Sequence, residues 1–178
     1  MNSDAKALIL SIDDDPEILS LIERFLTTSG YRVMTADSGP TGLEAIGKVK
    51  PNLILLDIRM PGMDGYAVCS RLQENSETAY IPVIFVTALG EDQDKARAFS
   101  VGAVDYLVKP IQRDILLESV RKHLKTGSRW KDLHKGAVKW YEMISPADFI
   151  QFKEFLFAQL DLSPEQKYKY SGITPSKV

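Results

Sequence analysis

The chain has 178 residues and a net charge of −2, with 44% hydrophobic and 26% charged residues. This balance is typical of one folded domain of ordinary size with an appendage, and it excludes a chain that stays disordered. The charge favours no direct binding to DNA, because no basic stripe is present. No apolar run reaches the roughly 20 residues that cross a bilayer, and the N-terminus lacks the pattern of a signal peptide, so no membrane partner is expected. One cysteine, Cys69, excludes an internal disulfide and favours the cytoplasm; we interpret it as a packing residue.

Apolar runs alternate with helical patterns along the first 125 residues. The predicted strands are Ala7–Ile12, Tyr31–Thr35, Leu53–Leu56, Pro82–Val86 and Val104–Val108. The predicted helices are Pro16–Ser29, a helix from the N-cap Ser38 to Lys48, a helix beginning at Tyr66–Leu72, Asp92–Ser100, and Arg113–Leu124. Regular alternation with short links predicts an α/β fold, in which a parallel sheet is covered by helices on both faces.

The last of these helices has a clear apolar pattern. We expect Ile115, Leu116, Val120 and Leu124 to face inward. His123 falls on the same helix, and we interpret it, like His134 further on, as a surface or partly packed residue.

The pattern changes after residue 125, so we divide the chain into residues 1–125 and a helical extension, 126–178. Helical spacing resumes over Arg129–Ile144, and Ser145 and Ser163 each precede a proline in the manner of a helix start. The aromatic residues of this extension favour two interpretations: folding back onto the first domain, or a docking or homodimer surface. No helix-turn-helix with basic residues and no catalytic output motif is visible. The polar end is also consistent with the start of a longer output region.

Reactive side chains follow four of the five predicted strands. The first strand is followed by Asp13-Asp14-Asp15, the third by Asp57, the fourth by Thr87 and the fifth by Lys109. The carboxyl ends of parallel strands meet at one edge of the sheet, where such folds bind their ligands. Clustered carboxylates repel one another unless a cation lies among them, and their oxygens suit Mg²⁺. With a lysine and a hydroxyl beside them, these groups predict a site that handles phosphoryl groups.

Asp57 is the expected nucleophile of this site. It ends the apolar stretch LILLD, where a buried charge would be costly without a partner. A carboxylate in such a place can accept a phosphoryl group to form an aspartyl phosphate.

Four motifs, IDDDPEI, LLDIRMPGMDG, VTAL and DYLVKP, resemble in order and spacing the receiver domain of two-component response regulators, over about residues 5–125. The resemblance implies a doubly wound, flavodoxin-like sheet with strand order 2-1-3-4-5. It implies Asp57 as phosphoacceptor, Asp13, Asp14 and the backbone carbonyl of Arg59 as further Mg²⁺ ligands, Thr87 and Lys109 as groups that contact the phosphoryl group, Tyr106 as an aromatic switch, and a cis Lys109–Pro110 bond. The implied partners are a sensor histidine kinase or phosphotransfer protein and an output partner that is unknown.

Plainer interpretations also exist: Asp57 could cap a strand end, Thr87 could be an ordinary strand-end hydroxyl, and Lys109 could lie in a solvated turn. Tyr106 is an aromatic of an edge strand, where packing is the usual role, and Asp15 suits the N-cap of the first helix. Two other functions remain as alternatives: a scaffold of receiver fold that is never phosphorylated, and a phosphatase or phosphotransferase with an aspartyl phosphate intermediate. The second usually has an acid two residues after the nucleophile, where this chain has Arg59. We therefore expect a protein that is not an enzyme beyond catalysing its own modification.

Overall fold

The structure is a computed structural model that describes residues 7–88 and 92–125. Five parallel strands form one sheet in the order β2-β1-β3-β4-β5, which confirms the predicted topology. The strands are β1 (Leu8–Ile12), β2 (Arg32–Ala36), β3 (Leu53–Leu56), β4 (Val83–Thr87) and β5 (Asp105–Val108). Each predicted strand end lies within one residue of the observed end, the usual uncertainty of such boundaries.

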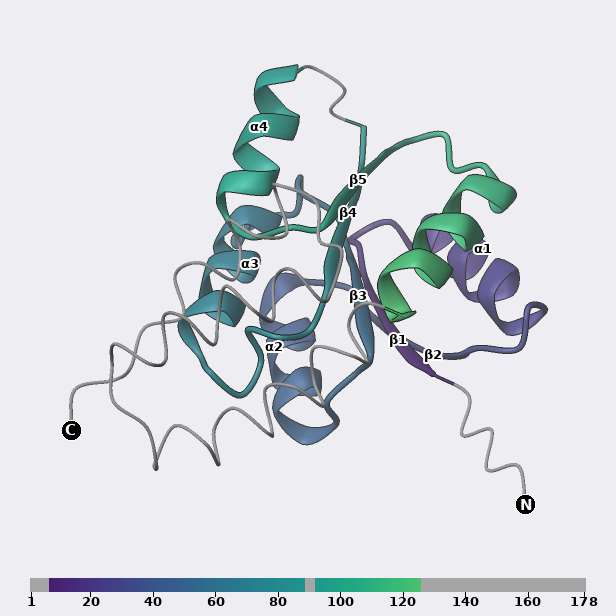
Figure 1. Ribbon diagram of the computed structural model, residues 1–178, viewed down its shortest axis with the longest axis horizontal. Helices are drawn as coiled ribbons and strands as arrows, with labels where there is room; N and C mark the ends of the chain where they lie inside the picture. Colours follow the sequence, from purple (N-terminus) through teal and green to yellow (C-terminus); the bar gives the residue numbers. More distant parts are fainter. Residues whose placement is uncertain (1–6, 89–91, 126–178) are drawn as a thin grey trace, which may run out of the picture.

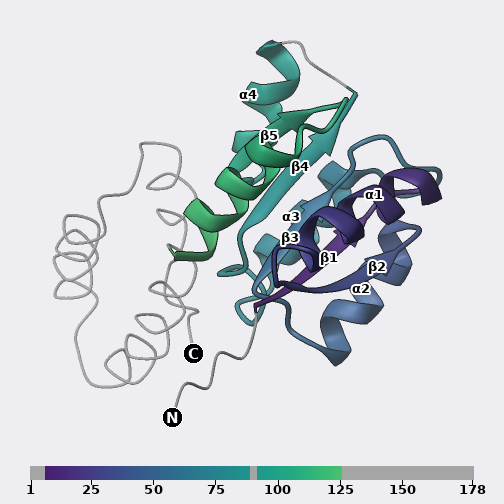
Figure 2. The ribbon, with the colours of Figure 1, turned by 90° about the vertical axis from the view of Figure 1, so that its right-hand side faces the viewer.

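Helices cover both faces of the sheet (Figures 1 and 2). The helices are α1 (Pro16–Thr27), α2 (Gly39–Lys48), α3 (Gly65–Glu74), α4 (Asp92–Ser100), and a last described helix over residues 113–125. In Figure 1, α1 and the 113–125 helix lie on one side of the sheet, and α2, α3 and α4 lie on the other. Two buried apolar clusters correspond to these two layers.

The central strands form the rigid part of the fold. All residues of β1, β3 and β4 are buried, as expected for strands between two helical layers. Burying the side chain of one leucine, isoleucine or valine of these strands contributes about 2 kcal/mol to stability. Groups attached to the ends of these strands are therefore held in fixed positions.

Local signals set the ends of α1. Asp15 is its N-cap and accepts the Glu17 N–H at 2.8 Å, as predicted. The helix ends at Thr27, two residues before the predicted end, because Gly30 turns the chain with φ of 91°. The Tyr31 N–H then donates to the Leu26 carbonyl at 3.0 Å and closes the last turn.

Two expectations for the 113–125 helix were wrong. Ile115 is 50% exposed, whereas Leu116, Leu117 and Val120 are buried. Leu116 and Val120 are buried and Leu124 packs against the same apolar cluster, as expected, so Leu117 takes the place expected for Ile115. His123 lies on this inward face and is only 1% exposed, not a surface or partly packed residue.

The helices expected in the extension, over Arg129–Ile144 and after Ser145 and Ser163, lie outside the described residues. Cys69 is buried, in agreement with its interpretation as a packing residue. None of the helices that the structure describes has the length and apolar character needed to span a bilayer.

Candidate functional site

The fold brings four of the predicted site residues to one edge of the sheet. Asp13 directly follows β1, Asp57 follows β3, Thr87 ends β4 and Lys109 follows β5. Asp13, Asp57 and Thr87 are buried, with 1%, 5% and 0% exposure. Backbone bonds fix these exits: the Asp57 N–H donates to the Ile12 carbonyl at 2.8 Å, and the Lys109 N–H donates to the Thr87 carbonyl at 2.9 Å. The Lys109–Pro110 bond is cis, as the resemblance implied.

Three carboxylates converge at this edge. One oxygen each from Asp13, Asp14 and Asp57 lie within 4.8 Å of one another, although Asp14 itself is exposed. The Lys109 ammonium lies 2.7 Å from Oδ2 of Asp13 and 3.6 Å from Oδ2 of Asp57. Lys109 is therefore paired with two of the three acids.

The charges of this cluster are only partly balanced. Burial raises the pKa of Asp13, and the nearby Asp57 carboxylate acts in the same direction, against the hydrogen bond and charge of Lys109. Oδ1 of Asp57 is buried and has no hydrogen-bond partner among the described residues. A buried carboxylate oxygen without a donor is costly in a protein that binds nothing there.

These observations fit a divalent cation. Mg²⁺ prefers carboxylate oxygens and is usually held by one or two carboxylates, with water and phosphate in the remaining positions. The cluster offers three such groups, and the unpartnered oxygen of Asp57 is one that a metal or a phosphoryl group would satisfy.

The loop after Asp57 requires glycine at one position. A Cβ on Gly65 would overlap the backbone carbonyl of Asp57, which lies against it. The Gly65 N–H donates to the Ile58 carbonyl at 2.9 Å, and Asp64 is the N-cap of α3. Gly65 therefore allows the start of α3 to pack directly against the strand end that carries Asp57.

Replacing Gly65 with alanine should destabilise the protein by about 2 kcal/mol, because the overlap is with backbone that cannot move aside. Gly47→Ala is the matched control. It lies within α2 with nothing within 4 Å of the added Cβ, so it should be neutral or stabilise by about 0.5–1 kcal/mol. Urea unfolding of both variants checks this. Equal stability of the two variants would show that the close approach at Gly65 has no energetic importance.

Tyr106 lies on β5 among groups from several elements. It is partly buried, and burial raises its pKa to about 12, with Asp94, Tyr66 and Asp57 acting in the same direction and Arg59 against them. The phenol therefore stays protonated near neutral pH. It lies close enough to Asp57 and Arg59 for their charges to affect its pKa. Its role as a switch, and the role of the carbonyl of the exposed Arg59 as a metal ligand, remain predictions.

The contacts that hold α4 were not predicted. Of its described side chains, only that of Ala98 is buried. Tyr66 of α3 donates its hydroxyl to the Asp94 carbonyl at 3.3 Å, and the Arg97 guanidinium lies 4.0 Å from the centre of the Tyr66 ring. The same ring packs edge-on against Phe85, the neighbour of Tyr106 in the sheet. No spacing in the sequence connects Tyr66 with Arg97, so only the fold reveals the contact.

A buried polar cluster on the opposite face of β5 was also missed. Oδ2 of Asp105 accepts the Ser119 hydroxyl at 2.7 Å and lies 2.9 Å from Nε2 of His123. Burial alone would raise the pKa of Asp105, but the hydrogen bonds from His123 and Ser119 outweigh it and lower this pKa to about 2. The carboxylate is therefore ionised at all ordinary pH values.

This shift makes stability depend on pH in the acid range. The folded-state pKa of about 2 lies below the ordinary 3.8, so the unfolded chain takes up a proton more readily than the folded one. The contribution is present above about pH 4 and is lost as the pH falls through about 2, with a total of about 2 kcal/mol. Chemical unfolding at several pH values, on wild type and Asp105→Asn, isolates it. The stability difference between the two should shrink toward pH 2; a difference that stays constant would contradict the lowered pKa of Asp105.

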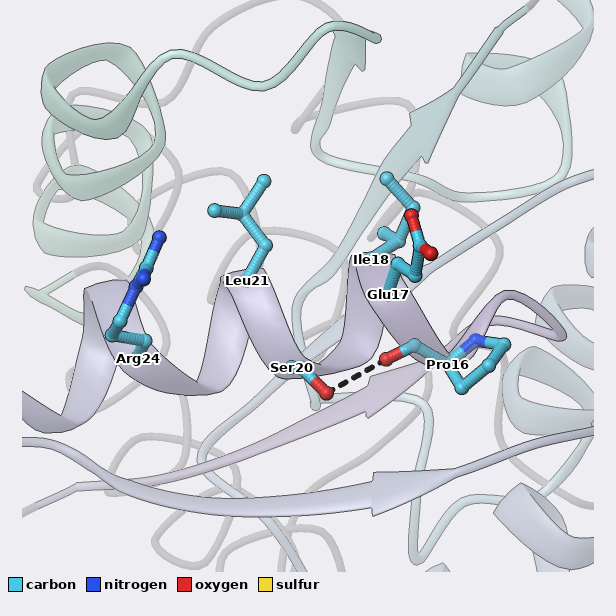
Figure 3. Close-up of a pocket in the computed structure, with 6 residues that line it drawn as sticks. All are labelled: Pro16, Glu17, Ile18, Ser20, Leu21 and Arg24. Carbon is cyan, nitrogen blue, oxygen red and sulfur yellow. Dashed lines mark hydrogen bonds between the residues drawn. The ribbon is translucent and has the colours of Figure 1, made fainter.

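An open pocket lies along α1, the helix that directly follows Asp13, Asp14 and Asp15 (Figure 3). The described residues that line it are Pro16, Glu17, Ile18, Ser20, Leu21 and Arg24. The Ser20 hydroxyl is bonded to the Pro16 carbonyl at 2.8 Å and so satisfies the helix backbone. None of the strand-end residues lines this pocket, so the phosphoryl chemistry is not expected inside it.

Comparison with known proteins identifies the family. A family model described as the response regulator receiver domain matches residues 9–121, which include every strand-end residue described above. The chain belongs to the response regulator receiver family. Receiver domains are phosphorylation-controlled signalling modules, and residues 9–121 form one.

Individual relatives agree with this assignment. The DNA-binding dual master transcriptional regulator RpaA of Synechocystis is 44% identical over 121 residues, covering 68% of this chain and 50% of RpaA. A probable transcriptional regulator ycf27 of Guillardia theta is 31% identical over 166 residues, covering 93% of this chain and 60% of that protein. The BeF3-activated receiver domain of RstA from Klebsiella pneumoniae is 33% identical with a TM-score of 0.60, covering 66% of this chain and 97% of that one. The chain thus spans about half the length of RpaA.

Proposed function

We propose that Asp57 of this receiver domain accepts a phosphoryl group from a sensor histidine kinase or a phosphotransfer protein, with Mg²⁺ held by Asp13, Asp14 and Asp57. The observation that carries this proposal is the state of the Asp57 carboxylate. It is buried, Oδ1 has no hydrogen-bond partner among the described residues, and Oδ2 lies 3.6 Å from the Lys109 ammonium. A nucleophile is thus held at the end of a rigid strand beside a cation.

The transfer needs few groups. A carboxylate oxygen of Asp57 forms a bond to phosphorus while the phosphorus–nitrogen bond of a phosphohistidine breaks, and its electron pair leaves with the imidazole, which takes up a proton. Bound Mg²⁺ supplies charge neutralisation for the phosphoryl oxygens. Lys109 and Thr87 supply an ammonium and a hydroxyl, from the two neighbouring strands, for the oxygens of the product.

Phosphorylation would then change the partners of Lys109. In the present structure its ammonium is bonded to Asp13. A dianionic phosphoryl group on Asp57 would compete for this ammonium and for the Thr87 hydroxyl, and so draw the ends of β4 and β5 toward it. Tyr106, between these groups and α4, is the residue that we propose as the aromatic switch.

The output is a further proposal. The regulators RpaA and ycf27 are longer than this chain, and the alignment with ycf27, at 166 residues, extends past residue 125. We propose that residues 126–178 form a helical extension that carries the signal onward, either as a surface for an output partner or second copy or as the start of a longer output region. The receiver itself acts in the cytoplasm, without membrane or direct DNA contact, and as no enzyme beyond its own phosphorylation and dephosphorylation.

A turnover assay separates this function from its two rivals. Phosphoryl incorporation into the chain and phosphate release are both measured with acetyl phosphate and with p-nitrophenyl phosphate, in the presence of Mg²⁺ and of a chelator. The proposed receiver would retain about one phosphoryl group per chain from acetyl phosphate, only with Mg²⁺, and would not turn over the ester. Sustained turnover of p-nitrophenyl phosphate would support the phosphatase, and no reaction with either would support the scaffold.

A further inference from the structure

A second polar cluster, outside the phosphoacceptor site, connects β5 to the 113–125 helix. It consists of Asp105, Ser119 and His123, which we call the Asp105 latch. Both oxygens of the Asp105 carboxylate are occupied: Oδ1 accepts the Tyr106 N–H at 2.9 Å, and Oδ2 accepts from Ser119 and His123. Since Oδ2 is an ionised acceptor, the hydrogen of the His123 contact is assigned to Nε2.

The two helix residues of the latch are buried, and Asp105 is partly buried. Ser119 is 5% exposed and His123 is 1% exposed. Both donate to the same oxygen of Asp105, and no bond joins the serine to the histidine among the described contacts, so this is not a nucleophile and base pair.

Histidine carries a cost at this position. Its Nδ1 is buried and has no hydrogen-bond partner among the described residues. The buried side chains of this layer, such as Leu116 and Val120, are apolar, and an apolar residue at position 123 would bury no polar atom. A polar cluster retained at such a cost needs a reason beyond packing, such as fixing one arrangement of two elements.

The place of the latch in the fold suggests that reason. Among the described strands, β5 lies at the edge of the sheet and pairs with β4 alone. Tyr106 belongs to the apolar cluster on the α3 and α4 side, and Leu107 belongs to the cluster on the other side. Asp105 contacts the same side as Leu107, because alternate residues of a strand face opposite ways.

The 113–125 helix is thus attached to β5 at two places. The chain connects them directly after Lys109, and the latch connects Asp105, at the start of the strand, to the last turns of the helix. Ser119 and His123 are four residues apart and so lie on one helix face. Residue 125, where the described helix ends, is only two residues beyond His123.

We infer that the Asp105 latch couples a movement of β5, when Lys109 and Tyr106 respond to phosphorylation, to the end of the 113–125 helix that leads into the extension. This inference rests on the proposed function. The apolar contacts of the helix, made by residues such as Leu117, Val120 and Leu124, allow sliding because they have no directional preference, whereas the hydrogen bonds of the latch do not.

The test measures amide hydrogen exchange with Mg²⁺, with and without beryllofluoride as the phosphoryl mimic. His123→Leu removes the donor but keeps an apolar side chain, and His123→Gln keeps an amide N–H donor near the position of Nε2. In wild type, exchange in residues 113–125 should change by about fivefold or more, the usual lower range of coupling between sites. In His123→Leu this change should fall below about twofold, while β4 and β5 still respond, and His123→Gln should restore it.

Two results would overturn the latch: an undiminished response of residues 113–125 in His123→Leu, or a wild-type response limited to β4 and β5. If His123→Leu does not fold, Ser119→Ala replaces it, because this variant removes only one hydroxyl and should fold normally. We expect an intermediate loss of the response of residues 113–125 in Ser119→Ala, and an unchanged response would refute the coupling. Failure of the proposed function differs from these results, because wild type would then bind no mimic, take no phosphoryl group from acetyl phosphate and show no response in any segment; the latch proposal would fall with it.

Discussion

Replacing Lys109 with alanine should leave phosphoryl uptake largely in place and remove most of the conformational response to it. The Asp57 nucleophile and the acidic cluster remain in the variant, and these perform the transfer. The variant loses the ammonium that now bonds Asp13 at 2.7 Å and would move toward the phosphoryl group. Moving a two-state element from mostly off to mostly on takes about 5.5 kcal/mol of differential binding, and a charge-assisted contact to a dianion is a major part of it.

The variant has a second expected effect, on stability. Lys109 is the cation that faces the buried Asp13 and Asp57, and removal of one partner of a buried pair costs about 3 kcal/mol or more. Added Mg²⁺ should restore part of this loss, because it supplies the missing positive charge. Lys125→Ala, at an exposed lysine of the last helix, serves as the control and should change neither property.

Three measurements check the Lys109 prediction: phosphoryl uptake by intact mass, amide exchange in β4 and β5 with beryllofluoride, and thermal unfolding with and without Mg²⁺. A full exchange response in Lys109→Ala would show that the lysine does not transmit the switch. A melting temperature that does not depend on Mg²⁺ would show that no cation replaces it.

The second large effect concerns the metal. Asp13→Asn should weaken Mg²⁺ binding by about a hundredfold or more. Removing a residue that only hydrogen-bonds to a metal ligand already lowers metal affinity by about 10- to 100-fold, and Asp13 is expected to be a ligand itself. The buried Asp13 carboxylate lies in the three-acid cluster, and the asparagine keeps its shape but not its charge. Calorimetric Mg²⁺ titration of the variant measures the loss.

Asp37→Asn is the matched control for this experiment. Asp37 is an exposed acid after β2, outside the cluster, and its carboxylate accepts the Thr41 hydroxyl. The affinity of the Asp37→Asn variant for Mg²⁺ should stay within about twofold of wild type, because exposed charges are screened by salt. Equal losses in both variants would mean that Mg²⁺ binds through general negative charge and not through the cluster.

The layout of the sheet and the location of the site could be predicted from the sequence because the relevant signals are local. The stretch LILLD identifies a buried strand that stops at a carboxylate, and parallel strands bring Asp13, Asp57, Thr87 and Lys109 to one edge without knowledge of side-chain contacts. The cluster of three acids follows from topology alone. Its distances do not, and they determine that Lys109 bonds Asp13 more closely than Asp57.

The features that were missed depend on contacts between distant segments. The inward face of the last helix includes the polar side chains of Ser119 and His123, which an apolar pattern does not identify. A buried histidine looks like a surface residue in the sequence until its partner Asp105 is known, and that partner lies 18 residues earlier in the chain. The contact of Arg97 with Tyr66 is of the same kind.

The most direct test of the phosphoacceptor assignment is the intact mass of wild type and Asp57→Asn after incubation with acetyl phosphate and Mg²⁺. We expect one added phosphoryl group on wild type, absent when Mg²⁺ is chelated, and none on the variant, because the amide is not a nucleophile of this kind. An adduct of equal yield on Asp57→Asn, or one on wild type that forms without Mg²⁺, would contradict the account of this site.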